Sequence, residues 1–413
     1  MRLQYRTGDV GIDPERRIWQ KMNIDDFNPY DEKLQQEPFG IYEQLRTKQP
    51  VYYNERRGFW VISRYEDVKA AFRNHEQFSS AEGVTLIYDS DGRATDASLN
   101  ADILITSDEP HHKRLRDLVQ RAFTSRHIQK LEPRLRSIVS ELFDEVLQGG
   151  QCDYAAEFAG VYPATVICEL LGCDEEHRSL FKRTADDLVR NADSPLLETL
   201  KRNEEMLTVV SAHVQARKER REDDLISALL DARIDGESLS DTDLFGFIFL
   251  LLIAGTETTT NLLTNALVFL EDNRMLRKRL VETPELVPQV IEELLRLESP
   301  VQGLSRTTRQ KVIIAGTEIP AGERVLLLIG AANRDERKFN VPDAIDLSRE
   351  QRDHLAFGYG VHFCLGASLA RLEAKVGLEE TLRRIPLYSI DRPAAQRLKS
   401  GPIRGFSRLP ITF

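Results

Sequence analysis

The segment Phe357-Gly-Tyr-Gly-Val-His-Phe-Cys-Leu-Gly-Ala places one cysteine, Cys364, after a glycine-rich turn and before a predicted helix. Gly358 and Gly360 permit a tight turn that brings backbone N–H groups towards the sulfur. The positive end of the helix dipole also favours a thiolate there. Such a thiolate is typical of an attacking nucleophile, a redox thiol or a metal ligand. The alternative is a buried cysteine with no chemical role.

A polar run, Ala254-Gly-Thr-Glu-Thr-Thr, interrupts the most apolar helical stretch of the chain. Glycine followed by four polar residues is unfavourable inside a buried helix. A local conflict of this kind often marks a functional site. A threonine-rich polar face or a helix kink would give the same pattern.

Glu293 and Arg296 lie three residues apart in a predicted helix, so their side chains share a face and can pair. Taken alone, this spacing indicates an ordinary surface ion pair worth at most about 1 kcal/mol.

The cysteine segment resembles the haem-binding signature of the cytochrome P450 family, F-x-x-G-x-x-x-C-x-G. Phe357, Gly360, His362, Cys364 and Gly366 match it. The resemblance implies that Cys364 is the thiolate ligand of the iron of haem b, and that its donation favours O–O cleavage. It also implies that Phe357 packs near the sulfur and that Gly366 leaves room at the haem face.

The polar run resembles the family's oxygen-activation motif, A-G-x-[DE]-T. By this resemblance Ala254 and Gly255 open a groove for dioxygen above the haem. Thr258 would hydrogen-bond the bound dioxygen, and Glu257 would help to relay protons.

Glu293 and Arg296 match the family's E-x-x-R, whose role is structural, and Arg349 is the candidate for the second arginine of that network.

The resemblance further implies four cationic or imidazole groups around the haem propionates: His112, Arg116, Arg306 and His362. His112 and Arg116 match the family's H-x-x-x-R and lie one helical turn apart. Two details differ from the usual wording: Glu109 stands where proline is common, and Arg306 is followed by two threonines.

The elements that must position these residues are mostly helical. Ser240 is a good N-cap for an apolar helix that runs to about Asp272, roughly 45–50 Å at 1.5 Å per residue. A helix that long and apolar is expected at the centre of the protein. Further helices are predicted at 64–74, 131–147, 157–171, 196–214, 284–298 and 365–384. Strands are predicted at 51–54, 59–63, 311–314 and 386–390, and an irregular segment at 79–108.

The composition is that of an ordinary globular protein, with 41% hydrophobic and 30% charged residues among 413. The formal charge of -10 argues against a nucleic-acid binder. No apolar run reaches the roughly 20 residues of a bilayer span, so a cytoplasmic monomer without a membrane anchor is expected. We expect an N-terminal extension at 1–25 and one domain at 26–413: a mainly α cytochrome P450 fold with small marginal sheets. Three further cysteines are expected in the core: Cys152, Cys168 and Cys173.

The predicted function is haem-thiolate monooxygenation of an apolar small molecule, by hydroxylation or epoxidation. A peroxygenase driven by hydrogen peroxide is one alternative, and Glu257 with Thr258 argues against it. A non-catalytic haem protein is the other. Substrate contacts are expected from five apolar residues: Val84, Leu86, Val301, Leu304 and Ile403.

Electrons should come from a separate ferredoxin or flavodoxin-like donor and its reductase, because no reductase follows the cysteine segment. Between His111 and Lys130 there are six basic residues and one acid, Asp117. By resemblance this segment lies on the cysteine side of the haem, where an acidic donor would dock. The six are Lys113, Arg114, Arg116, Arg121, Arg126 and Lys130.

Overall fold

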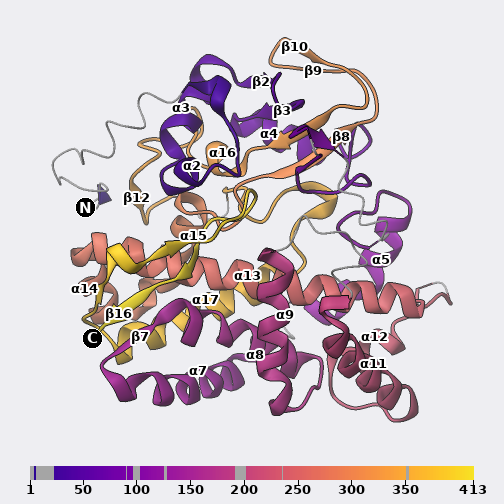
Figure 1. The fold of residues 1–413 in the computed structure, drawn as a ribbon. Coiled ribbons are helices and arrows are strands. Elements are labelled where there is room, and N and C mark those ends of the chain that lie inside the picture. The colour runs from indigo at the N-terminus through magenta and orange to yellow at the C-terminus, as the bar shows by residue number, and fades with distance from the viewer. Residues whose placement is uncertain are drawn as a thin grey trace.

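Helix α13 (Asp241–Asp272) runs through the middle of the molecule in the computed structural model (Figure 1). The structure describes residues 4–5, 23–89, 91–95, 103–124, 128–190, 201–234, 236–349 and 353–413. The predicted N-cap is confirmed: the Ser240 hydroxyl oxygen accepts from the Asp243 N–H at 3.1 Å, and the Asp243 carboxylate accepts from the Ser240 N–H at 3.1 Å. The cap fixes where the helix begins, and therefore where its polar run lies.

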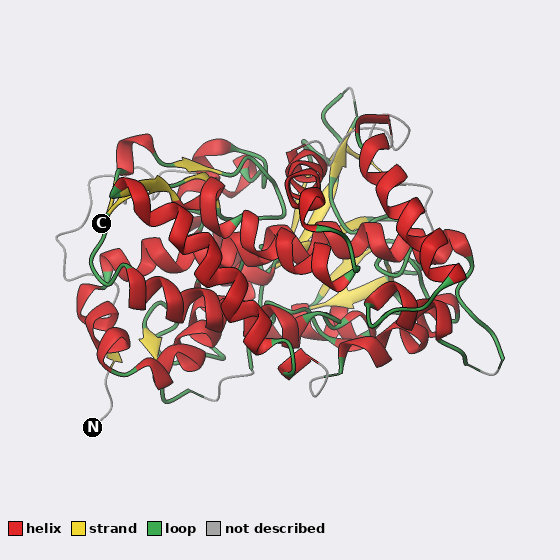
Figure 2. Ribbon diagram, turned by 90° about the horizontal axis from the view of Figure 1, so that it is seen from below, coloured by secondary structure: helices red, strands yellow, loops and turns green. Residues whose placement is uncertain are grey.

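Helices make up most of the molecule (Figure 2). Those that precede α13 are α2 (Glu32–Gln36), α3 (Phe39–Lys48), α4 (Tyr65–Arg73), α5 (His111–Val119), α7 (Glu132–Val146), α8 (Val161–Leu170), α9 (Arg178–Arg190), α11 (Glu204–Glu219) and α12 (Leu225–Asp231). Those that follow are α14 (Arg274–Glu282), α15 (Val287–Leu297), α16 (Ile329–Ala332) and α17 (Ala367–Arg384). The mainly α class expected from the sequence is confirmed.

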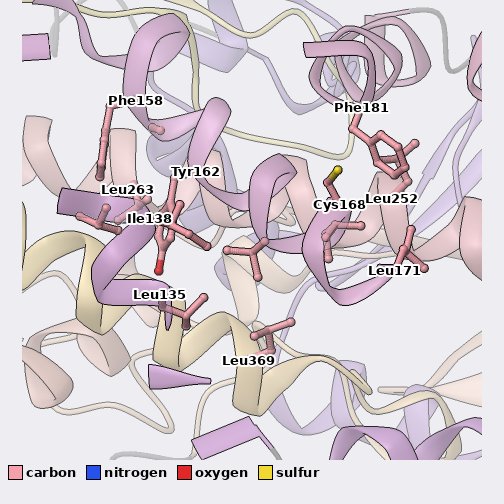
Figure 3. Close-up of a cluster of buried hydrophobic side chains, with 14 of the residues drawn as sticks. Leu135, Ile138, Phe158, Tyr162, Cys168, Leu171, Phe181, Leu252, Leu263 and Leu369 are labelled. Carbon is pink, nitrogen blue, oxygen red and sulfur yellow. The ribbon is translucent and has the colours of Figure 1, made fainter. Parts of the chain in front are cut away.

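The core lies where α8, α9 and α17 pack around α13 and α7 packs on α8 and α17. Figure 3 shows this cluster, with Leu252 and Leu263 of α13 facing side chains of the surrounding helices. By length and composition α13 could cross a membrane, and it is the one such helix in the described part of the chain. However, 56% of its most apolar window is buried inside the protein. That burial is the pattern of a central core helix.

The predicted helix at 157–171 is divided in two. Tyr154–Ala159 forms a π-helix, and α8 begins only after Gly160. The Gly160 N–H donates to the Ala155 carbonyl at 2.9 Å, five residues back. The Asp153 side chain caps the start of the π-helix. Residues 196–200 of the helix predicted at 196–214 lie outside the described residues, and α11 covers 204–214 of it.

The sheets are small and lie at the margin, as expected. The largest has the order β2-β3-β11-β8-β4, in which β11 is parallel to β3 and the other pairs are antiparallel. Its strands are β2 (Val51–Asn54), β3 (Phe59–Ile62), β4 (Phe78–Ser79), β8 (Leu304–Thr308) and β11 (Arg324–Leu327). This sheet carries the β8 segment towards the end of α13's polar run.

The remaining strands form pairs and one three-stranded sheet, β13-β16-β7. They are β1 (Gln4–Tyr5), β5 (Ile87–Tyr88), β6 (Ala94–Thr95), β7 (Gln151–Asp153), β9 (Val312–Ile314), β10 (Thr317–Ile319), β12 (Ile345–Asp346), β13 (Ser389–Ile390), β14 (Gln396–Arg397), β15 (Phe406–Arg408) and β16 (Pro410–Thr412). Within the described part of 79–108 there is no helix, which agrees with the predicted irregular segment. The proposed boundary at residue 25 stays a prediction, although β1 pairs with β12.

Candidate functional site

The cysteine segment forms a turn that only glycine can make at its tightest point. Gly360 has a φ of +73°, and a Cβ there would lie 2.7 Å from the backbone oxygen of Phe72. The Cys364 N–H donates to the Phe357 carbonyl at 2.9 Å. A Cβ on Gly366 would meet nothing within 4 Å, so this residue leaves its side of the turn open. The turn therefore holds the sulfur at the start of α17.

The electrostatics of Cys364 correct one expectation. Burial raises the pKa of the thiol, because protein surrounds it even though its sulfur opens on a cavity. A hydrogen bond from the Gly366 N–H and the charges of Arg116 and Arg371 lower the pKa, but less than burial raises it. The helix terminus alone therefore does not produce a free thiolate. A metal cation at the sulfur would displace the proton.

A cavity of about 250 Å³ opens in front of the sulfur. Helices α13 and α17 form two of its walls, and α5, β8 and the cysteine turn form the others. Most of its surface is aliphatic or aromatic. Among its lining residues are Leu104, Phe123, Phe247, Leu250, Leu251, Leu262, Leu295, Val301, Leu304, Ile329, Leu365 and Leu369. It is thus an apolar chamber with a thiol at its wall.

All four predicted cationic or imidazole groups line this cavity. The rings of His112 and His362 lie 4.1 Å apart between centroids. Arg116 donates to the Phe363 carbonyl at 2.7 Å, and Arg306 donates to the Ser305 carbonyl at 2.7 Å. The structure therefore brings together residues that are 250 positions apart in the chain from first to last.

The buried ring of His112 has unsatisfied hydrogen-bonding capacity. Its side chain is 1% exposed, yet neither ring nitrogen has a hydrogen-bond partner among the described residues. Burial lowers the pKa of His112 to about 4 and, with nearby Arg306, that of His362 to about 3. Both rings are therefore neutral at pH 7, while Arg306, whose pKa burial lowers to about 10, stays charged. A carboxylate ligand would satisfy these donors.

The polar run of α13 faces the cavity with Ala254, Gly255 and Thr258. The Thr258 hydroxyl donates to the Ala254 carbonyl at 2.7 Å, so it can rotate to another acceptor at small cost. Gly255 has a second role, because a Cβ there would lie 2.8 Å from Cδ1 of Ile167 on α8. Gly255 thus permits close contact between α13 and α8, in addition to leaving space in the cavity.

Glu257 does not line the cavity. It is 7% exposed, and the Asn261 amide donates to its carbonyl oxygen at 2.7 Å and to its Oε2 at 3.5 Å. Glu257 and Thr258 therefore present their side chains to different surroundings. A proton passing from one to the other needs an intervening group.

A buried carboxyl that the sequence reasoning missed, Glu373 of α17, does line the cavity. It is 1% exposed, and the Thr259 hydroxyl donates to its Oε2 at 2.9 Å. Its Oε1 has no partner among the described residues. Burial raises its pKa to about 8, so it carries a proton at pH 7. One signal was available: Glu373 occupies a position in the apolar stripe of α17, between Leu369 and Val376.

The predicted pair of Glu293 and Arg296 is formed and buried. Arg296 is 2% exposed and donates to both carboxylate oxygens, at 2.8 and 2.9 Å. Arg349 completes the network from 3.3 Å, as the resemblance implied. Arg296 also donates to the carbonyls of Pro342 and Ala344, at 2.6 and 2.9 Å. The pair therefore anchors the segment before the cysteine turn, unlike a surface ion pair.

A second buried carboxylate, Glu292, anchors the other side of the turn. Arg371 donates to its two oxygens at 2.6 and 2.9 Å, and His354 lies 3.0 Å away. Burial acts to raise the pKa of Glu292, but the hydrogen bonds from His354 and Arg371 outweigh it and lower the pKa to about 2. The Arg371 guanidinium also lies over the Phe357 ring, 4.4 Å from its centroid. Glu292 thereby ties α15 to both ends of the cysteine segment.

The five predicted substrate contacts divide into two groups. Val301 and Leu304 line the cavity, but Val84, Leu86 and Ile403 do not. The Val84 carbonyl accepts from the Ser305 N–H at 2.7 Å, which joins it to β8. Leu86 is 3% exposed in a separate hydrophobic cluster, and Ile403 forms a bridge with Val301 beside a smaller pocket. These three predictions are corrected: an apolar side chain near the site can belong to the core.

Known proteins match this architecture. The profile described as Cytochrome P450 matches residues 191–283 and 279–392. Cytochrome P450 109 of Bacillus spizizenii is 36% identical over 386 residues, covering 91% of each chain. The chain belongs to the cytochrome P450 family. Cytochrome P450s are monooxygenase oxidoreductases that use a haem held by a cysteine thiolate.

Solved structures of two other cytochrome P450s have the same fold. CYP109Q5 from Chondromyces apiculatus is 36% identical with a TM-score of 0.83, and the match covers 94% of this chain and 98% of that chain. CYP109E1 from Bacillus megaterium, solved in complex with testosterone, is 34% identical with a TM-score of 0.81, and the match covers 91% and 99%.

The residues of this cytochrome P450 fit a haem. The cavity has a thiol at one wall, and four groups that can hold carboxylates include an unpartnered buried imidazole. Most of the remaining lining is apolar, as a porphyrin face requires, with Thr258, Thr259 and Glu373 as polar exceptions. The cavity therefore offers a thiol for the iron and four groups for the propionates.

Proposed function

We propose that this enzyme is a haem-thiolate monooxygenase in which Cys364 is the iron ligand. The observation that carries the assignment is that Cys364 shares one cavity with His112, Arg116, Arg306 and His362. When bound, haem supplies the activation of O₂ from which one oxygen atom enters the substrate and the other leaves as water. His112 and Arg306, with Arg116 and His362, would hold its propionates. Cys364 would hold its iron as the thiolate, and the hydrogen bond from the Gly366 N–H would stabilise that charge.

Thr258 is the residue we propose to deliver protons inside the cavity. Its hydroxyl lies in the cavity wall, and by giving up its bond to the Ala254 carbonyl it would be able to donate a hydrogen bond into the cavity. Glu257, which precedes Thr258 in α13, supplies protons to it through an intervening group. The apolar walls exclude bulk water, so that protons arrive by this route.

We propose an apolar, uncharged substrate of steroid type. Among the described residues that line the cavity, the cationic side chains are Arg116 and Arg306, and both are assigned to propionates. No cation in that part of the chain is then left to bind a fatty-acid carboxylate. CYP109E1, which is 34% identical, was solved with testosterone. Val301 and Leu304 face the substrate space.

We propose that a separate acidic ferredoxin or flavodoxin-like protein, reduced by its own reductase in the cytoplasm, supplies the electrons. Phe363 is 41% exposed next to Cys364 and beside Arg116, which offers a short path for an electron. Lys113 is 65% exposed on the same helix as Arg116, although it pairs with Asp117. Arg114 pairs with Glu237 at 3.4 Å, so part of the expected positive charge is offset. Arg126 lies outside the described residues, as does the Arg121 side chain.

The test is turnover by the haem-loaded enzyme with O₂, a reduced ferredoxin and testosterone. Product carrying one atom of labelled oxygen from O₂ supports the proposal. Product with hydrogen peroxide alone, and none with O₂ and donor, favours the peroxygenase. No product under either condition favours a non-catalytic haem protein. A spectral titration with testosterone and with palmitoleic acid separates a wrong substrate class from a wrong function.

A further inference from the structure

A second group of potential metal ligands lies away from the cavity. Asp174 follows α8, His177 ends the short helix η5 (Glu175–His177), and His213 lies on α11. One ligand atom from each lies within 4.8 Å of the other two. None of the three residues lines the haem cavity. This group therefore needs an explanation of its own.

The backbone that carries these side chains is fixed by hydrogen bonds that do not use the side chains of the group. The His177 N–H donates to the Asp174 carbonyl at 3.0 Å, which closes the turn after α8. Arg217, one helical turn beyond His213, donates to the Gly172 carbonyl at 3.1 Å and so holds α11 against that turn. These contacts hold the three residues close to one another.

The two imidazoles are in a state suited to metal binding. Their rings lie edge to face, with centroids 5.7 Å apart and an interplanar angle of 88°. Nδ1 of His177 is buried and has no hydrogen-bond partner among the described residues.

The two arginines near the group have carboxylate partners of their own, which offset their charge. Arg217 pairs with Asp224, and Arg178 donates to Glu169 at 3.0 Å. Oε1 of Glu176 lies 3.9 Å from Nε2 of His177. A carboxylate beside the second ring nitrogen is the usual partner of a metal-bound histidine.

We propose that Asp174, His177 and His213 bind one divalent cation of the zinc type and tie α11 to the turn after α8. Two imidazoles, one carboxylate and a water complete a tetrahedral site. Calcium and magnesium prefer all-oxygen sites and fit poorly. Ligands at about 2.1 Å from the metal lie about 3.4 Å apart. The present ligand atoms lie within 4.8 Å of one another, so side-chain rotation, in part by the exposed Asp174, would have to bring them closer on binding.

The experiment is a calorimetric titration of Zn²⁺ into the haem-loaded enzyme after treatment with a chelator. Haem loading keeps Cys364 occupied. We expect one equivalent to bind, and the Kd to rise at least about 10-fold in each of Asp174→Asn, His177→Gln and His213→Asn. His111→Gln, which removes a half-exposed histidine of α5, is the matched control and should leave the Kd unchanged. An unaltered haem spectrum verifies that each variant is folded.

A second readout reports the site directly. Cu²⁺ bound in place of Zn²⁺ should show nitrogen coupling in its electron paramagnetic resonance spectrum, which His213→Asn reduces. Zn²⁺ should also slow amide exchange across 204–219 in the wild type and not in His213→Asn. The proposal is overturned if Zn²⁺ does not bind, or if the three substitutions leave the Kd unchanged.

Discussion

Replacing Glu373 by glutamine tests whether a buried, protonated carboxyl lines the cavity. Glutamine has nearly the same shape and can still accept from the Thr259 hydroxyl, but it does not titrate. In the wild type, burial raises the pKa of Glu373 from 4.5 to about 8. The folded state therefore holds a proton that the unfolded chain releases as the pH rises above 4.5.

The sign and size of the effect follow from linkage. The folded pKa is raised, so the contribution of Glu373 to stability is complete below pH 4.5 and is lost as the pH rises towards 8. Between the two pKa values, each pH unit lowers the free energy of unfolding by about 1.4 kcal/mol. Over pH 5.5 to 8 the wild type should thus lose about 3 kcal/mol that Glu373→Gln retains.

The assay is urea denaturation followed by circular dichroism at several pH values for both proteins. Glu282→Gln is the control, because that side chain is 61% exposed on α14. The stability of Glu282→Gln should change with pH in the same way as that of the wild type. An infrared band of a protonated carboxyl, present in the wild type and missing in Glu373→Gln, supplies a second check. Parallel pH profiles for Glu373→Gln and the wild type would refute the reasoning.

Three further predictions concern the proton route, the cysteine turn and the donor surface. Thr258→Ala should bind haem normally but lower the ratio of product to reductant consumed by about 10-fold or more, with hydrogen peroxide rising in step; unchanged coupling would leave Thr258 only a helix residue. Glu292→Gln should cost about 3 kcal/mol at pH 7, because the pKa of Glu292 is lowered from 4.5 to about 2. That stability is present above pH 4.5 and lost as the pH falls towards 2, so urea midpoints of the two proteins should converge on acidification, and a constant difference would contradict this. Arg114→Glu should slow haem reduction by an acidic ferredoxin at low salt. Glu237→Gln removes the carboxylate that pairs with Arg114 and should therefore speed the reduction. Stopped-flow rates that respond to neither change would exclude this surface as the docking site.

The central helix and the cysteine turn could be predicted because their signals are local. Ser240 and the apolar run that follows define where α13 begins, and glycines frame Cys364. The small strands could not be predicted as well, because each depends on a distant partner. β8 pairs with β11 and β4, for example, and no pattern within a five-residue segment specifies that pairing.

The site residues could be predicted where residue type and order were distinctive. They could not be predicted as well where the role of a side chain depends on the residues packed around it. Leu86 and Val301 look alike in the sequence, but one packs in the core and the other lines the cavity. In the sequence Arg114 looks like an unpaired surface charge, but in the structure it pairs with Glu237, which is 123 residues away in the chain. Glu373 was missed because its raised pKa comes from burial, which emerges only when α17 packs against α13.

The most direct test of the central claim is the absorption spectrum of the reduced enzyme with carbon monoxide bound. If Cys364 is the iron ligand, the wild type should show the red-shifted band of a thiolate-ligated haem. Cys364→Ser should lack that band, whether or not it retains haem. A wild-type protein that binds haem without the red-shifted band, or a Cys364→Ser variant that keeps it, would contradict the assignment.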